Sequence, residues 1–287
     1  MPARTIKAMI MLKIITCTIY NVPMENKGLN MSVAVVVIPT YNEAENMAKL
    51  IPLLFGEIFP KIRNWKIKIL VVDGGSPDGT DMVVRDLAKK YEGLFLINEG
   101  SKKGIGAAYM KGFDYAIREI SADVIIEFDA DFQHPPETIA TLLEKIDEGY
   151  DYVIGSRVMN GGSEPAGRGF VRTLLTEGGG WVARLVLFFP GKYFRAVTDP
   201  TSGLRATRVK CCLEKFILEP GRLYSKKFGY KLQLLSETLK TGARYGEIPL
   251  KFGSRMAGSS KIEFSTMFEI LISCFKTRLL GPKLLKS

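Results

Sequence analysis

The stretch VAVVVIPTYNEAENMAKL, residues 33–50, decides the fold class. Its first part, 33–39, is uninterrupted and apolar, which is typical of a strand buried on both faces. The segment 40–59 then starts with polar residues and predicts a helix, with Thr40 or Asn42 as its cap. A buried strand that leads directly into a helix is the repeating unit of a parallel α/β sheet.

The same alternation continues along the chain with short connections. Further strands are predicted at 66–73, 94–100, 123–129, 152–157 and 245–254, and further helices at 81–91, 104–120, 136–149 and 171–188. This order predicts a Rossmann-like, mostly parallel sheet flanked by helices. Ligands of such sheets bind outside the carboxyl ends of the strands. We therefore expect one crevice to collect Tyr41, Glu43, Asp73, Asp129 and Asp131.

The composition narrows the classes of partner and of chemistry. The chain has 287 residues, is 46% hydrophobic and carries a formal charge of +10, which favours an anionic partner. Four cysteines without a C-x-x-C spacing argue against a zinc site or a disulfide framework, and fit a reducing compartment. His134 is the only histidine, which excludes a His-rich metal site and any Ser-His-Asp triad that does not use it.

The two ends of the chain differ from its middle. No stretch reaches the roughly 20 apolar residues of a membrane span. We expect residues 1–30 to be a loosely ordered extension and 31–262 to be the globular domain. The segment 263–287 is amphipathic and basic. It either packs on the core or lies in a membrane interface, and the sequence leaves both alternatives open.

Two carboxylates follow the predicted strand at 123–129. In DADFQ, Asp129 and Asp131 flank Ala130, and Gln133 adds an amide oxygen. Paired carboxylates serve either as an acid and a base or as ligands of a divalent cation. Acid–base work at neutral pH needs a raised carboxyl pKa, and a basic neighbourhood lowers it. A hard cation held against an anionic ligand therefore fits these residues better.

The cations of the second half are candidate phosphate ligands. Arg157 ends a predicted strand, Arg172 lies on the next helix, and Arg255 and Lys261 flank a Gly-Ser loop. Two cations around such a loop can close over a diphosphate, although a solvated loop is the simpler alternative. The lysine-flanked glycines at 102–106 fit a phosphate site and an ordinary helix start equally well.

These motifs, in this order, resemble the family 2 glycosyltransferases with a GT-A fold. Within them, the chain is most similar to the dolichol- or polyprenol-phosphate mannose synthases. The matching stretches are IPTYNEAEN (38–46), VVDGGSPDGT (71–80), KKGIGAAYMKGF (102–113), DADFQHPPE (129–137), GSR (155–157), TDPTSGLRA (198–206) and FGSRMAGSSK (252–261). They span about 230 residues, from Met31 to Lys261.

The resemblance implies a role for each matching residue. Pro39, Tyr41, Glu43 and Asp73 match positions that hold the nucleotide, and Asp129 and Ala130 match positions at the donor sugar. Asp131 and Gln133 match metal ligands. Arg157 and Arg172 match positions near the donor sugar or the acceptor phosphate, and Arg255 and Lys261 match a loop that closes on the donor diphosphate. His134 then reads as a packing residue. Gly74 stands where relatives usually have a second acid, which leaves the preferred base open.

The resemblance also implies an activity. Similar enzymes transfer mannose from GDP-mannose to a lipid phosphate with inversion, using magnesium or manganese. Glucosyl transfer from UDP-glucose to the same acceptor is the nearest alternative, and a non-catalytic nucleotide-binding module is the alternative from another class. We expect a peripheral protein on the cytoplasmic face of a membrane, without a transmembrane span. No motif supports nucleic-acid binding.

Overall fold

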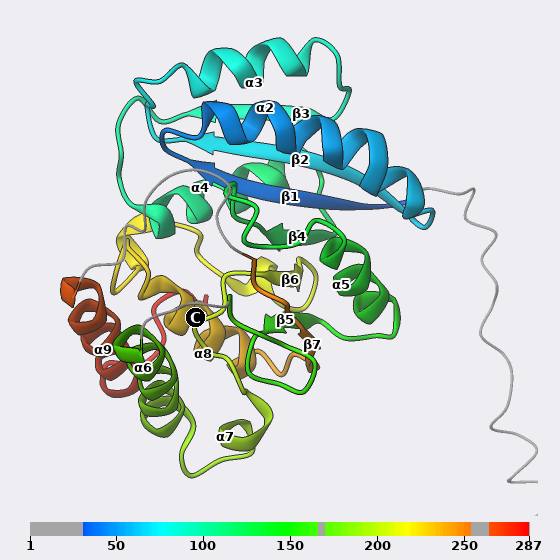
Figure 1. The fold of residues 1–287 in the computed structure, drawn as a ribbon. Helices are drawn as coiled ribbons and strands as arrows, with labels where there is room; N and C mark the ends of the chain where they lie inside the picture. Colours follow the sequence, from blue (N-terminus) through cyan, green and yellow to red (C-terminus); the bar gives the residue numbers. More distant parts are fainter. Residues whose placement is uncertain (1–30, 166–169, 254–263, 287) are drawn as a thin grey trace, which may run out of the picture. The chain divides into compact units, whose positions relative to one another are not determined.

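A computed structural model describes residues 31–165, 170–253 and 264–286 of the chain. Contacts divide the chain into Met1–Met31 and Ser32–Ser287, and the second unit carries everything that follows. Its centre is a seven-stranded sheet (Figure 1). The strands are β1 (Ser32–Thr40), β2 (Trp65–Asp73), β3 (Leu94–Asn98), β4 (Val124–Glu127), β5 (Tyr152–Ser156), β6 (Arg205–Arg208) and β7 (Tyr245–Pro249).

The strand order is β3-β2-β1-β4-β6-β5-β7. Pairing is parallel everywhere except around β6, which runs antiparallel to β4 and to β5. The predicted mostly parallel sheet is therefore confirmed, while β6 is a strand that the sequence pattern did not predict. Since β6 enters the sheet from the opposite direction, the segment before it lies at the carboxyl ends of β4 and β5.

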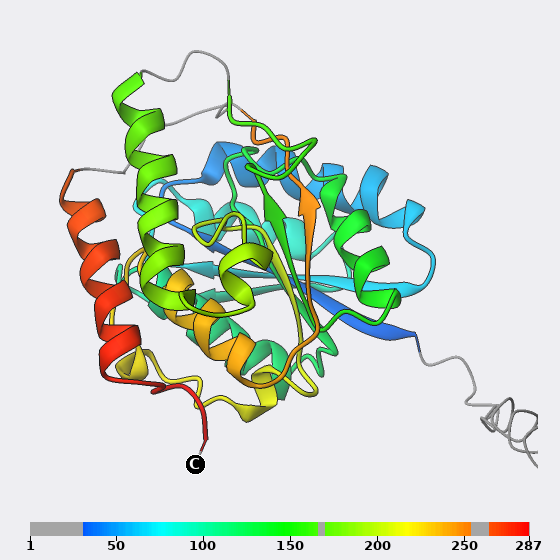
Figure 2. The same ribbon diagram turned by 90° about the horizontal axis from the view of Figure 1, so that it is seen from below.

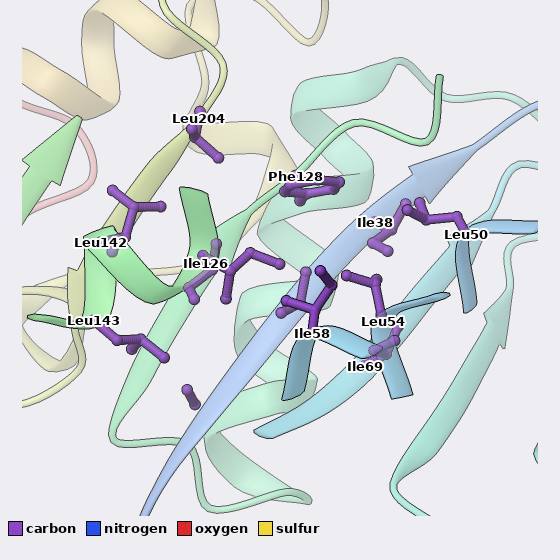
Figure 3. Close-up of a cluster of buried hydrophobic side chains, with 14 of the residues drawn as sticks. Ile38, Leu50, Leu54, Ile58, Ile69, Ile126, Phe128, Leu142, Leu143 and Leu204 are labelled. Carbon is purple, nitrogen blue, oxygen red and sulfur yellow. The ribbon is translucent and has the colours of Figure 1, made fainter. Parts of the chain in front are cut away.

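Helices cover both faces of the sheet. On one face, α2 (Ala44–Leu53), α3 (Thr80–Ala88) and α5 (Thr138–Asp147) bury apolar side chains against Val36 and Ile38 of β1 (Figure 1). Figure 3 shows Leu50 of α2 and Leu142 of α5 in this core, together with Ile38. On the other face, α4 (Ile105–Arg118) and α8 (Tyr230–Lys240) pack against Val35 and Val37. Alternate residues of β1 thus belong to two different cores, which explains the unbroken apolar run of this strand.

The first helix is shorter than predicted, and its cap is different. It begins at Ala44, and π-helical and 3-10 turns take over after Leu53. Thr40 and Asn42 do not cap it. Instead, the Asp78 carboxylate accepts a hydrogen bond from the Ala44 amide at 3.0 Å. Asp78 belongs to the turn SPDG that follows β2, and it reaches the start of α2 because β1 and β2 end side by side.

Two long helices lie side by side next to α8 (Figure 2). They are α6 (Phe170–Phe188) and α9 (Phe264–Leu279), and a short helix, α7 (Tyr193–Ala196), follows α6. Their buried residues share a core with α8, including Leu187, Leu235 and Cys274. In the described part of the chain, none of the helices combines the length and the apolar character needed to cross a bilayer.

Candidate active site

The carboxyl ends of β1, β2, β4 and β5 meet at one edge of the sheet. Thr40 pairs with Asp73 at the ends of β1 and β2, and Glu127 at the end of β4 pairs with Val37. Ser156 ends β5 on the same edge. The loops that follow these strands carry the predicted residues, so the geometry of the sheet brings them to one side of the molecule.

Asp73 is fully buried and organises the loop after β2. One carboxylate oxygen accepts hydrogen bonds from the hydroxyls of Thr40 at 3.0 Å and Ser76 at 2.5 Å. The other accepts from the amides of Gly75 at 3.0 Å and Ser76 at 2.9 Å. A carboxylate with four donors on it is fixed in place, and it fixes the loop beside Tyr41 in turn.

Tyr41 offers an aromatic surface next to this loop. The Lys102 ammonium lies 4.3 Å from the centre of the Tyr41 ring, a cation–π contact. A methyl group at Gly74 would lie 3.5 Å from the same ring, at ordinary contact distance. Glu43, two residues after Tyr41, accepts a hydrogen bond of 2.7 Å from the side-chain amide of Asn46. The loops after β1, β2 and β3 thus come together around the Tyr41 ring.

Asp129 is held by the only histidine. The Asp129 backbone amide donates to Nδ1 of His134 at 3.2 Å, and Nε2 of His134 lies 3.7 Å from the Asp129 carboxylate. Because Nδ1 accepts a hydrogen bond, the neutral ring carries its proton on Nε2, facing the carboxylate. Burial lowers the pKa of His134 to about 4, against the opposing effect of Asp129. Phe128 and Phe252 flank the ring.

Asp131 and Gln133 continue the same loop. Asp131 is almost fully buried, and its Oδ1 accepts a hydrogen bond from the Gln133 amide at 3.1 Å. The Gln133 side chain donates through Nε2 to the Gly253 carbonyl at 3.3 Å, which assigns its Oε1 as the acceptor end. The Gly253 amide donates back to the Gln133 carbonyl at 2.8 Å. The loop is thus tied to the residue that precedes segment 254–263.

Arg157 follows β5 and is already paired with carboxylates. Its Nε and Nη2 donate to the two oxygens of Asp199 at 2.6 and 2.8 Å, and its Nη1 lies 3.1 Å from Glu164. Nη2 also donates to Thr201 at 2.8 Å. Burial acts to lower the pKa of Arg157, but the neighbouring Asp199 outweighs it and raises that pKa. The arginine is therefore a fixed, permanently charged group with most of its donors in use.

Comparison with models of known protein families assigns this chain to a family. The model described as glycosyl transferase family 2 matches residues 35–192, more than half of the chain. The chain belongs to glycosyl transferase family 2. This confirms the resemblance drawn from the motifs, and the α/β GT-A fold is confirmed with it.

Curated relatives within this family carry consistent names. "Dolichol-phosphate mannosyltransferase" of Pyrococcus furiosus is 37% identical and covers 82% of this chain; the chain spans 61% of its length. "Polyprenol monophosphomannose synthase" of Mycolicibacterium smegmatis is 35% identical, over 82% of this chain and 83% of the relative. "Undecaprenyl-phosphate mannosyltransferase" of Micrococcus luteus is 31% identical, over 83% and 90%.

Solved structures show the same fold at lower sequence identity. Glucosyl-3-phosphoglycerate synthase from Mycobacterium tuberculosis, in complex with Mn²⁺, uridine diphosphate and phosphoglyceric acid, aligns with a TM-score of 0.62 and 18% identity. The alignment covers 88% of this chain and 80% of that one. The same synthase in complex with Mg²⁺ and uridine diphosphate gives a TM-score of 0.61.

Several residues of this candidate site were given no role by the sequence analysis. Asp199 and Thr201 lie in the matching stretch TDPTSGLRA, so the motif was visible in the sequence, but their hydrogen bonds to Arg157 were not. Glu164 left no local signal. Of the predicted residues, Arg255 and Lys261 lie outside the described part of the chain. Arg172 lies on α6, within the part of that helix where only the backbone is described.

Proposed function

We propose that the chain transfers mannose from GDP-mannose to a dolichyl or polyprenyl phosphate, with inversion at the sugar carbon and with Mg²⁺ or Mn²⁺. The observation that carries this proposal is that the only histidine is buried and its Nδ1 already accepts a hydrogen bond from a backbone amide, so that it offers no free base. An inverting transferase with a hydroxyl acceptor needs a general base. A phosphate acceptor is already ionised and needs none. The names of the curated relatives support the same acceptor.

The residues divide between the two substrates. We assign the donor nucleotide to Pro39, Tyr41, Glu43 and Asp73, which lie at or just after the ends of β1 and β2, where Tyr41 offers a ring for stacking. Asp129 and Ala130 then face the donor sugar, because they follow β4 at the same sheet edge. In the proposed roles, Arg157 and Arg172 bind the acceptor phosphate, and Arg255 and Lys261 close on the donor diphosphate.

The oxygen ligands at the β4 loop fit a hard divalent cation. Within the described residues, no group of three acidic, histidine or cysteine side chains could hold a metal alone. Asp131 and Gln133 supply one carboxylate and one amide oxygen, and Mg²⁺ commonly takes one or two protein ligands while substrate phosphates and water complete its shell. When bound, the cation would neutralise charge that develops on the leaving nucleoside diphosphate.

The proposed reaction is a single displacement. A phosphate oxygen of the acceptor forms a bond to the anomeric carbon of mannose, and the bond from that carbon to the donor β-phosphate oxygen breaks with its electron pair. No proton moves. The protein must bring two anions together, so its task is to position them and to screen their repulsion. Arg157, fixed by Asp199, is a preorganised positive charge of this kind.

Donor choice is tested by binding and by turnover. We expect calorimetry to show that GDP-mannose with Mn²⁺ binds at least about tenfold more tightly than UDP-glucose with Mn²⁺, a difference of about 1.4 kcal/mol. Radiolabelled mannose should appear on farnesyl phosphate. Tighter binding of UDP-glucose, with glucose transfer, would replace the mannosyl proposal by the glucosyl alternative. Donor binding without transfer of either sugar would favour the non-catalytic module.

The helices α6 and α9 support a peripheral membrane location. Large exposed apolar side chains gather on them: Trp181 and Leu185 on α6, Phe189 just after it, and Phe268, Ile272, Phe275 and Leu279 on α9. The α9 residues recur at the spacing of one helix face, and Lys276 and Arg278 border them. An apolar face bordered by cations is typical of a helix that lies in a membrane interface. We therefore propose that this face rests on the bilayer that carries the acceptor.

The membrane proposal predicts that two acidic substitutions on α9 weaken vesicle binding. Ile272 and Phe275 are 53% and 49% exposed, so Ile272→Glu combined with Phe275→Glu leaves the core intact. Vesicle binding should fall about 100-fold, because each lost apolar contact is worth about 1.5 kcal/mol or more. Flotation with vesicles of phosphatidylcholine and phosphatidylglycerol measures this. The control is Met82→Glu, on α3, at a side chain that is 64% exposed. Equal flotation of both variants would contradict the proposal.

A further inference from the structure

Lys231 is a buried lysine whose ammonium group reaches the active site. It is the second residue of α8 and is only 8% exposed. A methyl group at Gly203 would lie 2.6 Å from Nζ of Lys231 and 3.3 Å from Oδ2 of Asp129. The ammonium and the carboxylate therefore border the same small space, which exists because residue 203 has no side chain.

The contacts of the Lys231 ammonium differ from those of the nearby guanidinium groups of Arg157 and Arg205. Among the described residues, its ammonium lies 5.7 Å from the centre of the Phe228 ring and interacts with the opposite charges of Asp129 and Glu127. Arg157 is paired with carboxylates, and Arg205 donates to Tyr152 and to three backbone carbonyls. Burial outweighs the opposite charges of Asp129 and Glu127 and lowers the pKa of Lys231. A further anion beside the ammonium would therefore stabilise its charged form.

The rest of the fold places this ammonium in advance. The Lys231 carbonyl accepts a hydrogen bond of 2.8 Å from Arg205. Just before it, the amide of Gly229 donates to Glu269 and its carbonyl accepts from Ser273, at 3.2 and 3.0 Å. Both partners lie on α9. The start of α8 is therefore pinned from two sides, which reduces the entropy lost when a ligand binds.

We propose that Lys231 binds a phosphate oxygen in the active site and offsets charge as the two anionic substrates meet. This inference rests on the proposed function for the identity of those substrates. Lys231 takes no proton in the reaction: a phosphate oxygen bonds to the sugar carbon, and the electron pair of the broken bond leaves on the nucleoside diphosphate. The ligand is a phosphate group, and either the donor diphosphate or the acceptor monophosphate can supply it.

The test compares Lys231→Met with Lys240→Met. Methionine keeps the length of the side chain and removes its charge, and Lys240 is an exposed lysine at the other end of the same helix. Calorimetry has two arms: GDP with Mn²⁺, and farnesyl phosphate in detergent. We expect Lys231→Met to weaken at least one arm about tenfold or more, while Lys240→Met leaves both unchanged. The arm that weakens identifies the phosphate.

Two further results separate the possible outcomes. The melting temperature of Lys231→Met, followed by circular dichroism, shows whether the variant is folded before its affinities are compared. If that variant does not fold, Gly203→Ala takes its place, because its methyl group displaces Nζ and keeps the charge. Affinities equal to wild type in both arms overturn the role of Lys231. If the wild-type protein binds both probes but transfers no mannose, the proposed function is overturned and the role of Lys231 in phosphate binding is not.

Discussion

Asp131→Asn is expected to lower the rate of mannose transfer by about 10³-fold or more, because a metal ligand is worth several kcal/mol of transition-state stabilisation. Asparagine retains Oδ1, which accepts the hydrogen bond from the Gln133 amide, so the loop keeps its shape. The change removes charge and little else. Transfer to farnesyl phosphate, measured with saturating GDP-mannose and Mn²⁺, gives the rate.

A second readout shows whether the lost rate reflects the metal. Wild-type protein should bind GDP more tightly with Mn²⁺ than with EDTA, and Asp131→Asn should bind it equally in both. Asp86→Asn is the matched control, since Asp86 is an exposed carboxylate on α3 that pairs with Lys89. A variant at Asp131 with wild-type turnover, or with a retained response to EDTA, would end the metal role of this residue.

Asp199→Ala is expected to lower the free energy of unfolding by about 3–5 kcal/mol, because it leaves the buried Arg157 without its main partner. For a folded unit of this size, that corresponds to a fall in melting temperature on the order of 10 °C. Thermal unfolding followed by circular dichroism measures it. A melting temperature within about 2 °C of wild type would show that Glu164 alone suffices for Arg157.

A double variant separates the structural from the functional role of this pair. Arg157→Met combined with Asp199→Ala removes both charges, so most of the lost stability should return. Mannose transfer should remain low, because Arg157 is proposed to bind the acceptor phosphate. Recovery of stability and of transfer together would show that Arg157 serves the fold alone.

The pH dependence of this pair has a definite sign. Burial acts to raise the pKa of the Asp199 carboxyl, but the charge and hydrogen bonds of Arg157 outweigh it, so that pKa is lowered. A lowered pKa stabilises the folded state above the unfolded value of about 3.9. The stability gap between wild type and Asp199→Asn should therefore be full near neutral pH and shrink as the pH falls below about 4.

Much of the fold could be predicted from the sequence because its signals are local. The apolar run of β1 and the repeats of strand and helix each lie within a few residues. Their order is enough to give a parallel sheet and to place Asp73 and Asp129 at one edge. The strand β6 was missed because RATR is short and mostly polar, and it is a strand only because β4 and β5 flank it.

The local chemistry of the site was also visible in the sequence. Asp129, Asp131 and Gln133 lie within five residues after a buried strand, and their residue types suit a hard cation. The packing role expected of His134 is confirmed, but the sequence could not name its partner Phe252, which comes more than a hundred residues later. The cap of the first helix failed as a prediction for the same reason: Asp78 reaches it from another loop.

The α/β class, the order of the elements and the position of the carboxylate loop follow from the sequence, since periodicity and strand ends depend on neighbouring residues. The pairing of the charges became known from the folded structure. In that structure Arg157 pairs with Asp199, and Lys231 lies near Asp129 because Gly203, from a third segment, has no side chain between them. Pairing in a buried site depends on distances between segments that are far apart along the chain, and no local sequence pattern reports such distances.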